Sequence, residues 1–317
     1  MIDLLLLGTG GMQPLPDRWL SSLLLRCDGE LVLFDCGEGT QIPWKRFGWG
    51  FRRLSAICLS HVHADHVAGL PGLFHTLATS GRTEPVDIHG PAGVAAVVAG
   101  LRVIAPWLPY EVRVHEWGGG AQFLLPAGLV GSVIEGQHGV TSLAYRLDLA
   151  RARRFDPARA EASGIPRSAW TTLQRGEDAS WDGGTATPDD VMGPPRRGLA
   201  MGYMTDTTYL PTFADHFRGV DLLVTEGTYG DPGDAEKAKD HNHMTFTEAA
   251  TIAREAGARR LWLTHFSARM TDLVLYLPHA TAVFPATEVG HSGLTTRLDF
   301  DDEAEPSTGL IVTDRPA

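Results

Sequence analysis

The feature that most constrains this chain is the run Ser60–His66, which reads SHVHADH. Three imidazoles and one carboxylate fall within six residues, directly after an apolar run (Ala56–Ser60) that we predict to be a buried strand. Alternate side chains of an extended segment share a face, so His61 and His63 can point the same way. The following turn would bring Asp65 and His66 to a second position. Because imidazole and carboxylate are good zinc ligands, the run predicts metal binding rather than a hydrogen-bonded histidine patch.

Three further candidate ligands stand at comparable places in the chain. His138, Asp206 and His265 each come shortly after an apolar run that we predict to be a strand. Each of them alone would be read as an ordinary loop residue. Together with the first run, they could complete two coordination shells at one edge of a sheet.

The order of predicted elements favours an α/β fold in which helices cover layered sheets. Strands are predicted at Asp3–Leu7, Ser22–Arg26, Leu31–Phe34, Ala56–Ser60, Val86–His89, Val130–Glu135, Ser142–Leu147, Leu199–Met204, Asp221–Thr225 and Arg260–Thr264. Helices are predicted at Gly39–Phe47, Ala68–Thr79, Ala92–Leu101 and Thr247–Ala256, the last with Thr245 or Thr247 as a cap. Residues 150–197 lack long apolar runs, which indicates an inserted arm or small subdomain within a single domain spanning 1–317.

Charge and cysteine content narrow the class of protein. The net charge of -11 counts against binding nucleic acid over a broad surface, although metal ions could still meet phosphate directly. Three cysteines without close pairs (Cys27, Cys36 and Cys58) indicate free thiols in a reducing cytoplasm. The apolar run near the N-terminus is too short to span a bilayer and carries Asp3, so we expect no membrane association.

The glycines at 8, 10 and 11 follow a predicted strand, as those of a dinucleotide-binding loop do. The pattern G-x-G-x-x-G requires a third glycine where this chain has Gln13. Binding of a nucleotide cofactor is therefore the weaker interpretation of this segment.

The ligand run resembles the metal signature of the metallo-β-lactamase fold superfamily. More narrowly, the chain resembles the ribonuclease Z family of endonucleases, which trim the 3′ ends of precursor tRNA. Other matching segments are Leu7–Gly10, Leu33–Glu38 with Thr40 and Gln41, Gly69–Leu73, Ile88–Pro91, Ala144–Arg146, Gly176–Glu177 and Asp190–Arg196. The resemblance implies a four-layer αβ/βα sandwich with an inserted arm and with metals at one edge. It also implies a homodimer.

For the site, the resemblance implies two zinc ions, with manganese as a possible substitute. One ion would be held by His61, His63 and His138, the other by Asp65, His66 and His265, and Asp206 would bridge them. Asp65 would also accept a proton from the attacking water. His243, oriented by Glu226, would protonate the leaving oxygen, with His241 as a rival for that role. The expected reaction removes 3′ trailers from precursor tRNA by phosphodiester hydrolysis.

Several positions depart from the family pattern and bear on the substrate. Ala64 replaces a common glycine, Thr208 replaces an arginine that could contact phosphate, and Met270 replaces a tyrosine. The arm keeps Gly164–Trp170 without the second Gly-Pro, and residues 151–197 carry eight arginines against seven acids. This balance offers little counterion release on tRNA. Two alternatives therefore stay open: a related metallo-hydrolase acting on a small phosphodiester or other ester, and a non-catalytic RNA-binding or scaffold protein. The complete ligand set disfavours the second alternative.

Overall fold

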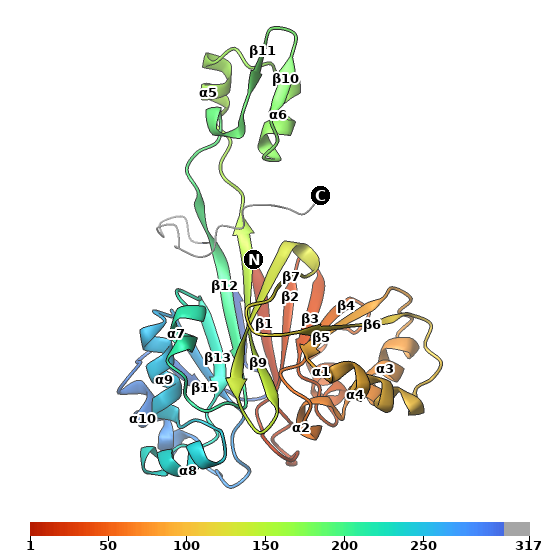
Figure 1. The fold of residues 1–317 in the computed structure, drawn as a ribbon, viewed down its shortest axis with the longest axis vertical. Coiled ribbons are helices and arrows are strands. Elements are labelled where there is room, and N and C mark those ends of the chain that lie inside the picture. Colours follow the sequence, from red (N-terminus) through yellow and green to blue (C-terminus); the bar gives the residue numbers. More distant parts are fainter. Residues whose placement is uncertain (301–317) are drawn as a thin grey trace. The chain divides into compact units, whose positions relative to one another are not determined.

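Two seven-stranded sheets are the framework of the unit that consists of residues 1–149 and 199–299 (Figure 1). The computed structural model describes residues 1–300. The first sheet has the order β16 (Thr295–Leu298), β1 (Ile2–Gly8), β2 (Ser22–Cys27), β3 (Glu30–Phe34), β4 (Leu54–Cys58), β5 (Val86–Pro91) and β6 (Val112–Trp117). Its strands pair antiparallel from β16 to β3 and parallel from β3 to β6, so the sheet is mixed.

The second sheet is also mixed. Its order is β15 (Thr287–Val289), β14 (Leu261–Thr264), β13 (Leu222–Glu226), β12 (Arg196–Met204), β9 (Thr141–Arg151), β8 (Leu129–Gln137) and β7 (Gln122–Leu124). Strands β12 to β15 run parallel, whereas β7, β8 and β9 pair antiparallel. Several strands of each sheet therefore end at the same edge, which is where ligands from distant parts of the chain can meet.

Both faces of each sheet are covered. Along β1, Leu5 and Leu7 pack with the helices on the outer face of the first sheet, while the alternate residues Leu4 and Leu6 are buried on its other face. The outer helices of this sheet are α1 (Gln41–Phe47), α3 (Leu70–Thr79) and α4 (Val94–Leu101). Those of the second sheet are α7 (Thr212–His216), α9 (Phe246–Glu255) and α10 (Leu277–Thr281).

Aromatic side chains join the inner faces of the two sheets. The hydroxyl of Tyr145 in β9 donates to the carbonyl of Leu59, at 2.7 Å. The rings of Phe34 in β3 and Tyr203 in β12 lie 4.9 Å apart. The predicted arrangement of two sheets between outer helices is thereby confirmed.

Element ends differ from the sequence prediction where polar side chains intervene. Strand β4 ends at Cys58, two residues earlier than predicted, and the amide of Ser60 donates to the Asp35 carboxylate instead of continuing the ladder. Helix α9 begins after Thr245, which forms a capping box with Glu248, so the first of the two predicted caps is confirmed. The short elements β6, β7, β15, β16, α7, α8 (Ala235–Asp240) and α10 were not predicted.

Residues 150–198 belong to a second compact unit. It contains α5 (Pro157–Ala162), α6 (Arg167–Gln174), β10 (Ala179–Trp181) and β11 (Gly184–Ala186). Ala160, Leu173 and Val191 form the centre of a small hydrophobic core, against which Trp170 and Trp181 pack. The unit is therefore folded around its own apolar side chains.

The thiols of Cys27, Cys36 and Cys58 are free and buried. None of the helices within residues 1–300 combines the length and the hydrophobicity that crossing a membrane requires.

Candidate metal centre

The seven predicted ligands meet where strands of both sheets end. They are His61 and His63 after β4, Asp65 and His66 in α2 (Ala64–Val67), His138 after β8, Asp206 after β12 and His265 after β14. Within the described chain, their ligand atoms form two groups, in each of which all atoms lie within 4.8 Å of one another. Asp206 belongs to both groups. Residues up to 204 positions apart in the sequence thus converge on one edge of the sandwich.

The first group contains His61, His63, His138 and Asp206. Nδ1 of His63 lies 3.0 Å from Nε2 of His61 and 3.2 Å from Nε2 of His138. Oδ2 of Asp206 lies 3.5 Å from Nε2 of His61 and 3.6 Å from Nε2 of His138. Three ring nitrogens and one carboxylate oxygen therefore face one small space, His63 with its Nδ1 and the other two histidines with Nε2.

The second group contains Asp65, His66, His265 and Asp206. Nε2 of His265 lies 2.9 Å from Oδ1 of Asp206 and 3.3 Å from Nε2 of His66. Oδ2 of Asp65 lies 3.5 Å from the His66 nitrogen and 3.6 Å from the His265 nitrogen. Two carboxylates and two imidazoles thus share the second space, and the two oxygens of Asp206 point one into each group.

Hydrogen bonds on the far side of the rings fix their orientation. Nδ1 of His66 donates to Asp35 at 2.8 Å, and Nδ1 of His138 donates to the carbonyl of Asn242 at 3.1 Å. The hydroxyl of Ser60 donates to Asp35, so it can accept from Nδ1 of His61, 3.0 Å away. When Nδ1 carries the proton, Nε2 keeps its lone pair for a metal ion.

Thr228 orients the ring of His265 in the way that Ser60 orients the ring of His61. Its hydroxyl lies 2.6 Å from Glu226 and 3.2 Å from Nδ1 of His265. A proton donated to the carboxylate leaves the hydroxyl oxygen free to accept from the imidazole. His265 therefore also presents Nε2 to the centre.

Burial favours the neutral form of two of the rings in the first group. Burial lowers the pKa of His61 well below its ordinary value, and the neighbouring His66 adds to that effect. Burial also lowers the pKa of His138, although the Asp206 carboxylate opposes this. A neutral imidazole is the form that ligates a metal ion.

In the second group, neighbouring carboxylates favour the protonated form of the imidazoles. Burial would lower the pKa of His265, but the Asp206 and Asp65 carboxylates raise it to about 10. Burial opposes ionisation of Asp65, yet hydrogen bonds with His265 and His66 hold its pKa well below the usual range. Protonated imidazoles thus supply positive charge between the carboxylates, at positions where a metal ion would supply it instead.

The donor set fits a pair of divalent cations. Three imidazole nitrogens and one carboxylate oxygen around one space are a donor set that suits zinc. Oδ1 of Asp206 is buried and accepts no well-directed hydrogen bond from any residue in the range 1–300, although His265 is near. The positive charge of the His265 imidazole, 2.9 Å away, offsets the cost of burying this oxygen, and a divalent cation would do the same.

Backbone strain accompanies the ligands. Asp206 and His265 have φ angles of +49° and +54°, in the left-handed region that few non-glycine residues adopt. Each such residue costs on the order of 1–3 kcal/mol. At each of these residues the chain turns sharply after its strand, which directs the side chain toward the metal centre. The strained backbone is therefore a consequence of placing these two ligands.

The glycine-rich segment after β1 serves the same centre. A side chain on Gly11 would begin 2.6 Å from the ring of His265, and the next amide, that of Met12, donates to Asp65 at 2.7 Å. The glycine therefore permits close approach of the backbone to a ligand, which accounts for it without a dinucleotide.

A buried carboxylate and a partly exposed imidazole lie beside the two groups. Nδ1 of His243 lies 3.1 Å from Oε2 of Glu226, a carboxylate that also accepts the amides of Thr207 and Met244. Burial would lower the pKa of His243, but the Glu226 carboxylate raises it above the ordinary value. Among residues 1–300, His241 has no carboxylate partner; its Nδ1 contacts the carbonyl of Lys237, at 2.7 Å. The geometry favours His243 over its rival as a proton donor.

The sequence analysis did not assign a role to Asp35, whose φ is +54° and whose side chain is fully buried. Its carboxylate accepts hydrogen bonds from the amide and hydroxyl of Ser60, from His66 and from the hydroxyl of Tyr203. The sequence feature that could have identified Asp35 is its position directly after a predicted buried strand, like the positions of the ligands. Thr228 and the carbonyl of Asn242 gave no comparable signal.

We expect Asp35→Asn to weaken metal binding by about 10- to 100-fold, because the amide cannot accept all of these protons and His66 loses its fixed orientation. The measurement is metal affinity by competition with a chromogenic chelator. Asp3→Asn, at a carboxylate bound by Arg26 and Arg297, is the matched control and should bind metal as the unaltered protein does. Equal affinities for all three proteins would contradict the assigned role of Asp35.

Comparison with known proteins places the chain in a family. A sequence model of the beta-lactamase superfamily domain matches residues 31–266. Ribonuclease Z of Lachnospira eligens is 43% identical over 303 residues, which cover 96% of this chain and 100% of the relative. Ribonuclease Z of Agathobacter rectalis is 40% identical over 303 residues, with coverage of 96% and 100%.

Solved structures agree on the fold. The crystal structure of the short form of human tRNase Z superposes with a TM-score of 0.69 at 23% identity, covering 94% of this chain and 100% of that one. The resemblance drawn from the ligand run and its neighbouring segments is thereby confirmed. This chain belongs to the beta-lactamase superfamily and, within it, to the ribonuclease Z family.

Proposed function

We propose that this protein is a zinc-dependent endonuclease that removes 3′ trailers from precursor tRNA. The observation that carries the proposal is the pair of four-residue ligand groups that share Asp206. Two ligand groups that share a carboxylate would hold a pair of metal ions, which suits hydrolysis of phosphodiesters. The relatives at 40–43% identity, which carry the name ribonuclease Z, support the same reaction.

Zinc is the ion we assign to both groups, because imidazole nitrogens and carboxylate oxygens suit it; manganese would accept the same ligands. His61, His63 and His138 would hold one ion, Asp65, His66 and His265 the other, and Asp206 would bridge them. When bound, the ions would lower the pKa of a water molecule and offset negative charge on the phosphate.

The chain's own groups would handle the protons. Asp65, held against Met12 by a hydrogen bond, would accept the proton that the attacking water loses. His243 would donate a proton to the leaving oxygen, which belongs to the upstream piece. Glu226 would keep that imidazole protonated and fix its orientation through the contact at 3.1 Å. The phosphate would stay on the downstream piece.

We place this activity in the cytoplasm, because free buried thiols such as those of Cys36 and Cys58 are typical of a reducing compartment. The balanced charge of residues 151–197 supports the second candidate, a hydrolase acting on a small phosphodiester. Within that segment Arg153 is already paired with Asp189, and Arg167 with Glu161. A test of function therefore has to include both kinds of substrate.

Purified protein should cleave a precursor tRNA at the boundary of its 3′ trailer, and Asp65→Ala should abolish that cleavage because it removes a ligand and a proton acceptor. The assay measures labelled RNA products beside hydrolysis of a small phosphodiester. Turnover of the small ester alone would favour the second candidate function, a hydrolase of small phosphodiesters. No turnover of either substrate by metal-loaded protein would contradict the proposed function.

The His243–Glu226 pair predicts a characteristic pH dependence. A proton donor stops working as the pH rises above its pKa, so the rate should fall on the alkaline side. Glu226→Gln removes the charge that raises the pKa of His243, and the alkaline limb of kcat should move to lower pH. His243→Ala should lower kcat by about 10²- to 10⁴-fold.

Glu255→Gln is the matched control for this profile, since Glu255 contacts Tyr209 and Arg254 outside the centre. Metal content and circular dichroism check that each variant is folded. An alkaline limb that stays in place in Glu226→Gln would show that the two residues do not act as a pair.

We also propose that the protein is a homodimer. Val103, Ile104 and Trp107 follow α4 and have exposed fractions of 75%, 71% and 89%, an apolar surface that supports burial against a second copy. Trp107→Glu should shift the mass measured by light scattering from dimer to monomer. Leu124→Glu, at an exposed leucine of β7, should leave it unchanged. A monomeric mass for the unaltered protein would refute the proposal.

A further inference from the structure

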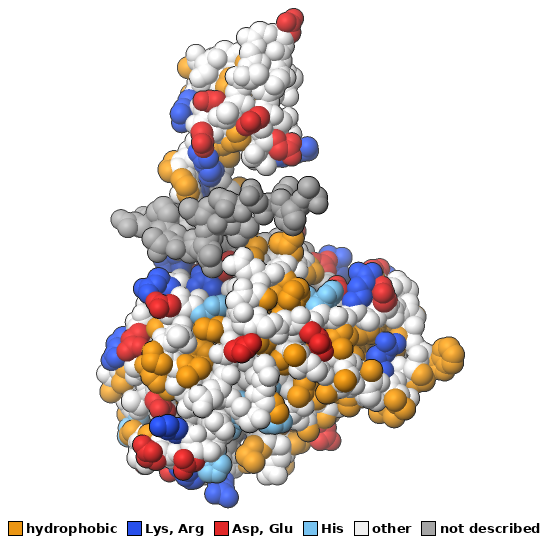
Figure 2. All heavy atoms as spheres, in the orientation of Figure 1, with side chains coloured by type: hydrophobic (Ala, Val, Ile, Leu, Met, Phe, Trp, Pro, Cys, Tyr) orange, Lys and Arg blue, Asp and Glu red, His pale blue; other side chains and the backbone are white. Residues whose placement is uncertain are grey.

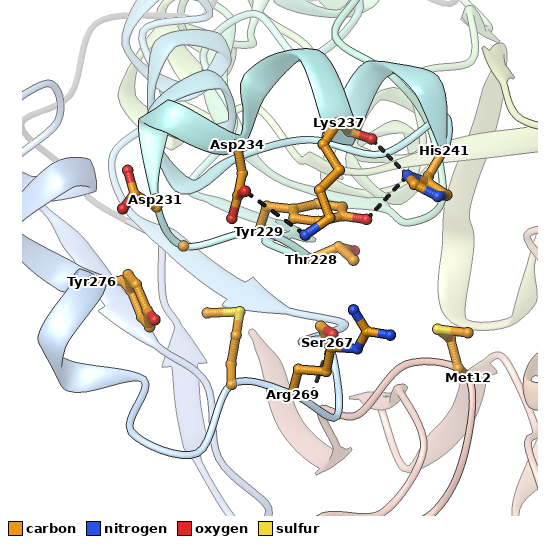
Figure 3. Close-up of a pocket in the computed structure, with 12 residues that line it drawn as sticks. Met12, Thr228, Tyr229, Asp231, Asp234, Lys237, His241, Ser267, Arg269 and Tyr276 are labelled. Atoms are coloured by element: carbon orange, nitrogen blue, oxygen red, sulfur yellow. Dashed lines mark hydrogen bonds and ion pairs between the residues drawn. The ribbon is translucent and has the colours of Figure 1, made fainter.

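A pocket of about 310 Å³ lies beside the metal centre, between α8 and the segment 267–270 (Figure 3). Met12 lines its right side in the view of Figure 3, and the amide of Met12 donates to Asp65. Thr228, which also lines the pocket, contacts both Glu226 and His265. The pocket is therefore continuous with the catalytic groups rather than a separate cavity.

Tyr229 forms a fixed aromatic wall of this pocket. Its amide donates to the carbonyl of Met244, and its carbonyl accepts from the amide of Phe246, which anchors the backbone. Nζ of Lys237 lies 5.1 Å from the ring centroid, and the hydroxyl lies 3.4 Å from Nδ1 of His241. In Figure 3 the ring lies between α8 and the open space of the pocket. It is held in place before any ligand binds.

Arg269 reaches into the same space from the opposite wall (Figure 3). Within residues 1–300 its guanidinium makes no hydrogen bond or ion pair, whereas the ammonium of Lys237 is paired with Asp234 at 3.8 Å. An unpaired guanidinium opposite an aromatic face suits a ligand that has both a planar ring and an anionic group. A nucleotide has both.

We propose that this pocket holds the first nucleotide on the 3′ side of the scissile phosphate. Its base would lie against Tyr229, and Arg269 would contact the phosphate that follows. The inference rests on the proposed function, because it takes precursor RNA as the substrate.

Size and flexibility favour the downstream side. The pocket is at the small end of the range of roughly 300–1,000 Å³ that is typical of ligand sites, so it can take one unpaired nucleotide but not a duplex. Most of the upstream piece is the base-paired body of the tRNA, whereas the trailer is a single-stranded part of the substrate. An aromatic platform accepts any base, as a trailer of variable sequence requires.

The first experiment compares two precursors, one of which lacks the base of its first trailer nucleotide. The unaltered protein should cleave the abasic precursor with kcat/KM lower by about tenfold, within the range expected for loss of one stacked base. Tyr229→Ala should lose about tenfold on the ordinary precursor and cleave the two equally. Tyr229→Phe, which keeps the ring, and Tyr209→Ala, at a tyrosine outside the pocket, should discriminate as the unaltered protein does.

The second experiment does not require cleavage. A precursor whose scissile O3′ is replaced by a methylene group carries 2-aminopurine either directly after or directly before the scissile phosphate. Binding should quench the fluorescence of the downstream probe with the unaltered protein and with Tyr229→Phe, but not with Tyr229→Ala.

Quenching of the upstream probe alone, or undiminished discrimination by Tyr229→Ala, would overturn the assignment of the pocket. The two experiments also separate this proposal from the enzymatic one. Quenching that depends on Tyr229 without any cleavage of the ordinary precursor would support the pocket while refuting the proposed function. Cleavage of both precursors at equal rates by the unaltered protein would support the proposed function while refuting the assignment of the pocket.

Discussion

The buried carboxylate of Asp35 is the interaction on which the rest of the centre depends. A charge without exposure to water is costly unless it is fully hydrogen-bonded, and this one accepts from Ser60, His66 and Tyr203. These donors come from the end of β4, from α2 and from β12 of the second sheet. One buried charge therefore positions a ligand, ends a strand and joins the two sheets. Packing of the sandwich and geometry of the centre are consequences of the same set of bonds.

Much of the fold and of the candidate ligand set could be predicted from the sequence, because both depend on local patterns. Apolar runs mark strands, and residues such as His61 and His265 stand immediately after them. Short, half-exposed strands such as β7 have no such pattern, and β16 is defined by its pairing with β1 across almost the whole chain. The orienting roles of Asp35 and Thr228 likewise arise from contacts between distant segments, which spacing alone does not show.

The charge distribution indicates that attraction of an RNA substrate would depend on a few local positive charges rather than on the whole surface. A protein with a net charge of -11 gains little from general attraction to a polyanion. Attraction would instead be concentrated at the metal ions and at single cations such as Arg269, close to the bond that is cut. Residues 151–197 carry nearly balanced charges, and Figure 2 shows acidic and basic side chains mixed on the unit that contains them, so counterion release there would contribute little.

The pairing of β1 with β16 has a consequence for synthesis of the protein. Residues 2–5 find their partners at 295–298, so the first sheet is completed only after nearly the whole chain has left the ribosome. Until then, the leucine-rich strand β1 presents an unpaired edge, which is a hazard for aggregation. The last ligand, His265, is also made late. The free edge of β1 is therefore open to pairing with other chains for most of the time that translation takes.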